Sequence, residues 1–536
     1  TLFRSRPTLA LVVAAGLLPA ALPASFTAAQ QPADKIVVTT ADDLPRHTYQ
    51  ISGKASEFLL STEPFAKFVA AVRADLEADL AGYQIEDPNT LQGYYQALQA
   101  VAMFEGRPDD ALALVEKARE LEKKESKKLM MGLTLRAVIA AKAAAKHDPG
   151  AAEAAFKATL DSAVRALPWQ VVRDEVTSGK GRAEIISKDL IMGSVKGSLD
   201  PVVEAQNGQI SQDIARGLVG TRMTIDTLLP FMPALAETYA KIIADNSAEK
   251  KDIWAAREVT LGETDKAAPV VVCIWDSGVD VSLFSGQLWT NPAEKPNGLD
   301  DDRNGFIDDV HGIAYDLDAQ PVAALLHPTD ELNNDLSMVM GHMKGYGDVQ
   351  ANIDSPEATA VKAHIRGLTA DAVKPFVEDL GLFGNYSHGT HVAGIAAAGN
   401  PFARLLPVRI TFDFRMIPQH APSVERAKAE AKAAAEVVAY LKAAGVRVVN
   451  MSWGGSRADI EGALETKGVG ADAAERAAMA REIFSIGKNA LETAMASAPE
   501  ILFIAAAGNS DNNVEFSEMI PSGIKLPNLI DRKSIV

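Results

Sequence analysis

The sequence is poor in cysteine, in aromatic side chains and in positive charge. Its 536 residues include one cysteine, Cys273, so no disulfide can form within the chain, and the apolar run at residues 270–274 marks Cys273 as a buried side chain. Lysine and arginine number 53 against 70 aspartates and glutamates, which gives a formal net charge of −17. Such an acidic chain argues against nucleic acid as a partner, because phosphate binding requires clustered Lys and Arg.

Long apolar runs are missing beyond the first 30 residues. Arg6 precedes an apolar run at residues 9–18, and small residues follow up to a candidate cleavage site at Thr27-Ala28-Ala29. This order is typical of a secretory signal peptide, here residues 1–29, and the run is too short to predict a membrane span. We therefore expect a secreted protein, periplasmic or extracellular, with no stable membrane span; an uncleaved anchor is the alternative.

Both ends of the chain carry residues that look foreign to it. Residues 1–5 and 531–534 can be translated from complementary nucleotide strings, and both resemble a sequencing adapter read as coding sequence. We therefore expect residues 1–5 and 531–536 to be adapter-derived, and the natural sequence to continue beyond both ends.

Residues 30–257 carry the pattern of α-helices. Alanine, leucine, glutamate and lysine dominate this region, and its apolar residues recur at helical spacing. Residues 91–121 are expected to form two helices joined at residues 106–108, with Asp109 and Asp110 in the first turn of the second helix. This hairpin resembles a single tetratricopeptide repeat, which would make the region a protein-binding module. An ordinary helical bundle and a prosegment are the open alternatives.

After a linker at residues 258–269, the pattern changes to short β-rich runs that alternate with helices. Strands are expected at residues 270–274, 446–451 and 501–505, and helices at residues 391–398, 424–444 and 472–498. Such alternation predicts an α/β fold with a parallel sheet flanked by helices on both faces, preceded by the mostly α-helical N-terminal region.

Four segments of this second half suggest chemistry. Asp276 follows the first strand directly, at the edge where ligands collect in open α/β sheets. His388 and His391 lie in the string His-Gly-Thr-His-Val-Ala-Gly, which opens a predicted helix and contains two glycines suited to close packing, Gly389 and Gly394. The remaining two segments follow later strands and contain Ser452, Trp453, Gly454, Ala506, Ala507, Gly508 and Asn509.

Taken singly, each segment has an ordinary structural interpretation. A turn can end a strand at Asp276, and His388 can be a core histidine. The two histidines could also bind a metal, but no motif supplies the third ligand that a zinc site needs.

Together and in this order, the four segments resemble the subtilisin family of serine proteases, the subtilases, over about residues 270–530. The resemblance implies an endopeptidase that acts on proteins or peptides and needs no cofactor for its chemistry. It implies that His388 is the general base, that Asp276 orients its imidazole and that Asn509 donates a hydrogen bond to the oxyanion. It also implies a substrate-binding surface formed by Ser452, Trp453, Gly454, Ala506, Ala507 and Gly508.

Two departures from the family pattern are visible. The spacing between Asp276 and His388 exceeds that of compact subtilisins, which implies an insertion at about residues 286–381. The family's nucleophile motif, Gly-Thr-Ser, is absent, so we expect the nucleophilic serine beyond Ile530 and this chain by itself to be inactive. Two alternatives stay open: a non-catalytic homologue that binds peptides, and an interaction protein whose helical half carries the main function.

An acidic stretch of the insertion matches most of an EF-hand-like calcium loop. Gly305 takes the turn position, and four side chains supply oxygen ligands: Asp300, Asp302, Asn304 and Asp308. Position twelve is His311 instead of a bidentate Glu, so the last ligand could move to Asp309. A structural calcium ion and a solvated turn are the two alternatives.

Overall fold

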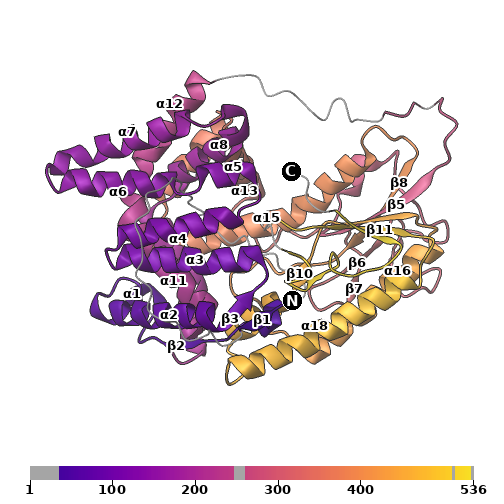
Figure 1. Ribbon diagram of the computed structural model, residues 1–536. Helices are drawn as coiled ribbons and strands as arrows, with labels where there is room; N and C mark the ends of the chain where they lie inside the picture. Colours follow the sequence, from indigo (N-terminus) through magenta and orange to yellow (C-terminus); the bar gives the residue numbers. More distant parts are fainter. Residues whose placement is uncertain (1–34, 247–259, 263, 510–512, 533–536) are drawn as a thin grey trace. The chain divides into compact units, whose positions relative to one another are not determined.

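The computed structural model describes residues 35–246, 260–262, 264–509 and 513–532 (Figure 1). The expected signal peptide at residues 1–29 lies outside them, as do residues 533–536 and residues 258, 259 and 263 of the expected linker. The described chain divides into two compact units. The helical unit comprises residues 35–246 and 340–374, and the sheet unit comprises residues 260–339 and 375–532, apart from the gaps above.

The helical unit confirms the predicted α-helical character of the N-terminal half. Its helices are α1 (Ala55–Phe58), α2 (Glu63–Gly82), α3 (Pro88–Phe104), α4 (Pro108–Leu121), α5 (Glu125–Met130), α6 (Leu133–Ala145), α7 (Ala152–Arg165), α8 (Trp169–Ile185), α9 (Lys188–Ser198), α10 (Asp200–Ala205), α11 (Gln212–Met223), α12 (Met232–Asp245) and α14 (Pro356–Gly367). Two short strand pairs accompany them: β1 (Ile36–Val38) with β3 (Tyr83–Ile85) in parallel, and β2 (Thr48–Gln50) with β4 (Gln209–Ser211) antiparallel. The predicted hairpin is α3 and α4, with Gly106 at φ 74° between them.

Part of the expected insertion belongs to this helical unit. α14 packs against α8, and Lys362 Nζ lies 3.4 Å from Glu184 Oε2. A Cβ added at Gly181 would lie 2.5 Å from Val349 O, so α8 approaches this segment closely. The chain therefore leaves the sheet unit within α13 (Leu336–Ala351) and returns to it within α15 (Ala370–Ala397).

The sheet unit is built on seven strands in the order β13-β11-β9-β5-β8-β6-β7. All neighbours pair in parallel except β6 and β7, which confirms the predicted parallel sheet. The strands are β5 (Val270–Asp276), β6 (Ile313–Tyr315), β7 (Pro321–Val322), β8 (Ala403–Arg409), β9 (Val448–Met451), β11 (Leu502–Ala506) and β13 (Leu529–Arg532). The remaining elements are α16 (Val424–Ala443), α17 (Arg457–Thr466), α18 (Ala473–Ala496) and an antiparallel pair, β10 (Gly455–Ser456) with β12 (Met519–Ile520).

Both faces of the sheet are buried, because successive side chains of β5 enter different cores. Cys273 and Trp275 belong to a large cluster with side chains of α16 and α18, which lie side by side in Figure 1. Ile274 points to the other face and packs with Ala393 and Ala397 of α15. The uninterrupted apolar run of β5 follows from this two-sided burial.

The helix that carries His388 begins much earlier than the sequence suggested. We expected the histidine motif at the start of a helix, but α15 starts at Ala370 and places His388 in its interior. Buried Val373, Phe376 and Phe383 repeat at helical spacing in its first half. Its end was predicted correctly, since Gly399 follows it at φ 68°.

Across the described residues, no helix is both long and apolar enough to cross a membrane.

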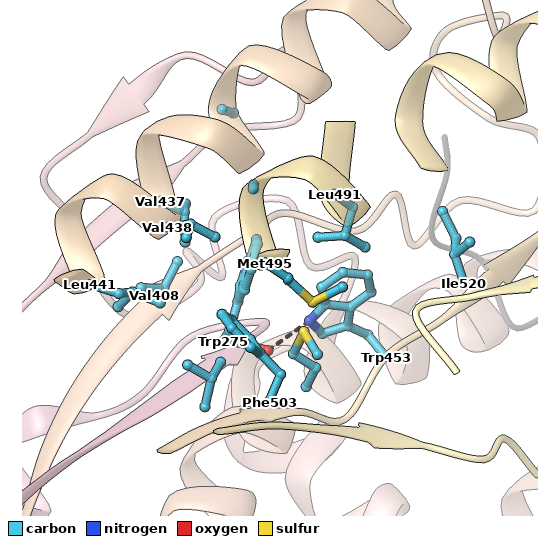
Figure 2. Packing of buried hydrophobic residues seen from close by; sticks show 14 of the residues in the cluster. Trp275, Val408, Val437, Val438, Leu441, Trp453, Leu491, Met495, Phe503 and Ile520 are labelled. Carbon is cyan, nitrogen blue, oxygen red and sulfur yellow. Dashed lines mark hydrogen bonds between the residues drawn. The ribbon is translucent and has the colours of Figure 1, made fainter. Parts of the chain in front are cut away.

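Trp453, two residues after the end of β9, hydrogen-bonds to β5 inside the large cluster (Figure 2). Its side chain is 7% exposed, and its indole N–H donates to the backbone oxygen of Trp275 at 2.8 Å. The two indole rings meet edge to face at 5.4 Å between centroids. The hydrogen bond thus satisfies a buried carbonyl at the end of β5.

We predict that Trp453→Phe destabilises the protein by about 1–3 kcal/mol, because it leaves that buried carbonyl without a donor. Scanning calorimetry of the full chain measures the loss. Trp289→Phe is the matched control, since no hydrogen bond of the Trp289 indole N–H occurs in the described chain. Equal losses in the two variants would refute the role of the hydrogen bond.

Candidate active site

Asp276 and His388 form the centre of the site. Asp276 ends β5 with a side chain that is 1% exposed, and its Oδ1 accepts from the backbone N–H of Ser277 and from His388 Nδ1, both at 2.7 Å. An ionised carboxylate can only accept, so the proton of this hydrogen bond sits on Nδ1. The neutral imidazole then offers Nε2 as a proton acceptor, on a side chain that is 52% exposed.

Asp276 raises the pKa of His388 above its ordinary 6.5, chiefly through this hydrogen bond and further through its charge, while burial acts in the opposite direction. The imidazole therefore stays protonated to a higher pH than in the unfolded chain. The stability contributed by the charged pair is fully present below the unfolded pKa and is lost as the pH rises through the folded pKa. A neutral imidazole, able to act as a base, prevails only above that raised value.

Gly389 lets α15 approach the loop after β5. A Cβ at Gly389 would lie 2.2 Å from Gly278 O, and Gly278 itself has φ 125°. Thr390 Oγ1 accepts from the backbone N–H of Asp280 at 2.9 Å, which holds the same loop. The close approach predicted for Gly389 is confirmed, whereas the tight packing predicted for Gly394 is wrong, because a Cβ there meets nothing within 4 Å.

The other expected site residues follow neighbouring strands. Ser452 comes directly after β9, Ala506 ends β11, and Ala507-Gly508-Asn509 follow it. Since β11, β9 and β5 are adjacent and parallel, their carboxyl ends lie at one edge of the sheet, the edge that carries Asp276. Asn509 is exposed there, so its amide is available to a ligand.

Fewer groups than the motif suggested are available to bind substrate at Ser452, Trp453 and Gly454. The Trp453 side chain belongs to the core, so only its backbone can line a site. Ser452 Oγ accepts from Asn450 Nδ2 at 2.8 Å. The backbone beyond Gly454 is already paired, because β10 hydrogen-bonds with β12.

Residues 268–530 match the subtilase family model, peptidase S8. The sheet unit belongs to a subtilase domain. This finding confirms the resemblance noted in the sequence, and with it protein substrates as the class on which such a domain acts. No curated protein matches the chain.

One buried cation near the loop after β5 was not predicted from the sequence. Arg409 ends β8 opposite Asp276, is buried, and reaches Leu326 O with Nη1 at 3.4 Å. A Cβ at Gly278 would lie 2.7 Å from Leu325 O and 3.1 Å from Arg409 Cδ. Arg409 therefore packs against the loop after β5; a charged residue at the end of the apolar run of β8 was the available signal.

The expected calcium loop is only partly assembled as the sequence suggested. Asp302 and Asp309 lie together with Glu294, and one carboxylate oxygen from each is within 4.8 Å of the others. Asp300 instead accepts from the backbone N–H groups of Asn304 and Gly305, at 3.1 and 2.9 Å. Within the described residues, this is the one group of three or more acidic, His or Cys side chains placed to hold a metal.

Asp308 and His391 lie outside that group. Asp308 Oδ1 accepts from the backbone N–H groups of Asn297 and Gly298, both at 2.9 Å. His391 is exposed on α15. Glu294 was missed because it precedes the loop pattern by several residues.

The two glycines of α15 provide a matched test of the close approach. We predict that Gly389→Ala destabilises the protein by about 1–3 kcal/mol through overpacking against Gly278. Gly394→Ala should stabilise it by about 0.5–1 kcal/mol, because alanine is the better helix former and nothing opposes its Cβ. Thermal unfolding of both variants measures the two changes in stability. Unchanged stability of Gly389→Ala would show that the loop after β5 moves to accommodate the added Cβ.

We predict that Asp276→Asn lowers the pKa of His388, because both causes of its elevation depend on the carboxylate. Histidine NMR titration of the full chain measures the change. Asp280→Asn is the control: the Asp280 carboxylate caps Ser282, with no contact to His388. An unchanged His388 titration in Asp276→Asn would contradict the assigned hydrogen bond.

Proposed function

We propose that the protein is a secreted serine endopeptidase that hydrolyses peptide bonds in proteins with Asp276, His388 and a serine C-terminal to Ile530. The observation that carries the proposal is the 2.7 Å hydrogen bond between buried Asp276 and exposed His388 within a subtilase domain. It leaves Nε2 facing outward as a base whose ring is held by a buried carboxylate.

In this mechanism, His388 Nε2 removes the proton of the serine hydroxyl as its oxygen attacks the scissile carbonyl carbon. Asp276 stabilises the imidazolium that forms. Asn509 donates to the oxyanion of the tetrahedral intermediate. The imidazolium then protonates the leaving amine, and water hydrolyses the acyl-enzyme by the same two proton transfers.

The serines near the site support a nucleophile elsewhere. Ser277 is buried, with its hydroxyl away from solvent. Ser387 donates to Phe383 O within α15 at 2.8 Å, and Ser452 is bonded to Asn450. Among the described residues, no serine hydrogen-bonds to His388.

Export and partners complete the proposal. The basic and apolar pattern of residues 1–29 supports secretion to the periplasm or the exterior. The net charge of −17 supports protein or peptide partners over nucleic acid. We assign the helical unit a protein-binding role on the strength of its helical hairpin, α3 and α4.

The test is casein hydrolysis, together with labelling by a fluorophosphonate, by the product of the intact gene. We predict that His388→Ala lowers kcat by at least about 10²-fold, the lower end for loss of a general base. Asn509→Ala should lower kcat with little change in KM, because its contact forms only in the transition state. His391→Ala, on the exposed side of the same helix, should leave both constants unchanged.

Three outcomes would decide against parts of the proposal. Casein digestion by His388→Ala at the wild-type rate would overturn the peptidase assignment. Hydrolysis by residues 1–536 alone would place the nucleophile within this chain. An intact product that binds casein without cleaving it or reacting with the probe would establish the non-catalytic homologue instead.

A further inference from the structure

Three carboxylates converge beside the core of the subtilase domain, apart from the Asp276–His388 pair. Glu294, Asp302 and Asp309 each place one oxygen within 4.8 Å of the others. Glu294 and Asp309 are 6% and 2% exposed, so two of the three groups have little access to solvent. Three like charges held this closely repel one another unless a cation or protons compensate them.

The protein itself supplies no cation here. No lysine or arginine of the described chain forms an ion pair with any of the three carboxylates. Glu294 Oε2 and Asp309 Oδ1 are buried, and neither has a hydrogen-bond partner. Unpaired buried carboxylate oxygens are costly, and metal coordination is one of the few ways to satisfy them.

Two side-chain amides and the backbone N–H groups of Asp302 and Asn304 donate to the three carboxylates. Asn291 Nδ2 donates to Asp302 Oδ2 at 3.0 Å and to Asp309 Oδ2 at 3.2 Å. Asn304 Nδ2 donates to the same two oxygens at 3.2 and 3.0 Å. Asp302 N–H donates to Glu294 Oε1 at 3.0 Å. The groups are therefore held in place from outside, as metal ligands usually are.

The amide orientation is fixed by the backbone. Asn291 Oδ1 accepts from Ala293 N–H at 3.1 Å, and Asn304 Oδ1 accepts from Phe306 N–H at 2.8 Å. Both amides thus present N–H₂ to the carboxylates, and the ligand oxygens come from the three acidic side chains. Water would complete the coordination shell.

We propose that Glu294, Asp302 and Asp309 bind a hard divalent cation of the calcium class. Carboxylate oxygens are the ligands that calcium prefers, and opposite ligands of one calcium ion lie about 4.6–5.2 Å apart, which matches the observed convergence. The proposal stands on side-chain geometry and burial, whatever the outcome of the peptidase test.

The site closes a long loop onto the core. Phe306, from the middle of the loop, packs edge to face on Tyr440 of α16 at 5.6 Å and on Tyr315 of β6 at 5.8 Å. Asn291 N–H donates to Val310 O at 2.8 Å and joins the two ends of the loop. The ion would therefore stabilise the loop and the sheet edge to which Phe306 is anchored.

Terbium luminescence and calorimetric titration of the full chain test the proposal. Tyr440 donates to Asp309 O at 3.4 Å, and its ring lies 6.0 Å from that of Trp289, so a lanthanide at the site is close to two sensitising side chains. After removal of metals with chelator, we expect sensitised terbium emission that calcium displaces. We also expect calcium to raise the unfolding temperature by several degrees.

The decisive variants are Asp309→Asn and Glu294→Gln, with Asp308→Asn as the matched control. The first two should weaken calcium binding by at least the roughly tenfold that loss of an outer-shell partner costs. Asp308→Asn keeps the oxygen that accepts from Asn297 and Gly298, and should bind calcium as the wild type does.

Stability in chelator separates a lost ligand from a misfolded variant. Without calcium, Asp309→Asn should unfold at the wild-type temperature or higher, because it removes repulsion; with calcium, it should unfold below the wild type. Absence of calcium and terbium binding by the wild type would overturn the proposal and indicate carboxyl groups that share protons. Equal weakening by Asp308→Asn would overturn the ligand assignment.

Discussion

The contact between α15 and the loop after β5 is the constraint on which the candidate active site depends. Gly389 lies so close to Gly278 O that a Cβ would not fit, and Thr390 Oγ1 accepts from Asp280 N–H of the same loop. This contact brings His388, within a long helix, to the end of a strand where Asp276 is buried. The contact between the two backbone segments places His388 Nδ1 2.7 Å from Asp276 Oδ1, so both side chains are held in the hydrogen-bonded geometry.

The parallel sheet is buried on both faces, which makes the contact between α15 and the loop after β5 rigid. β5 lies between β9 and β8 and contributes side chains to a core on each face. Trp453 adds a link from the end of β9 to the Trp275 carbonyl, one residue before Asp276. The carboxyl ends of β5, β9 and β11 are thus fixed relative to one another, which is what a site composed of three strand ends requires.

Local signals predicted β5, β9 and β11 and several helix ends of the sheet unit, because these depend on short-range chemistry, whereas β6, β7 and β8 were not predicted. β5 was visible as an apolar run, and Asp472, the first residue of the helix expected at residues 472–498, accepts from Glu475 N–H at 2.8 Å as the cap of α18. The start of α15 was hidden, because glycine and polar residues before His388 lower helix propensity while tertiary packing overrides it. Glu294 and Arg409 were missed for a similar reason: the fold, and not the local sequence, places them near the two sites.

The two units alternate along the sequence, and this order bears on the role of the helical half. If residues 30–257 were a prosegment released by cleavage at the linker, residues 340–374 would stay attached to the subtilase domain. Yet that segment is part of the helical unit: Arg366 Nε donates to Glu184 O at 2.9 Å, and α14 packs against α8. Release would strip the buried face of α14, including Val361, of its neighbours. The contacts of α14 with α8 therefore argue against the release of residues 30–257 by a single cleavage at the linker.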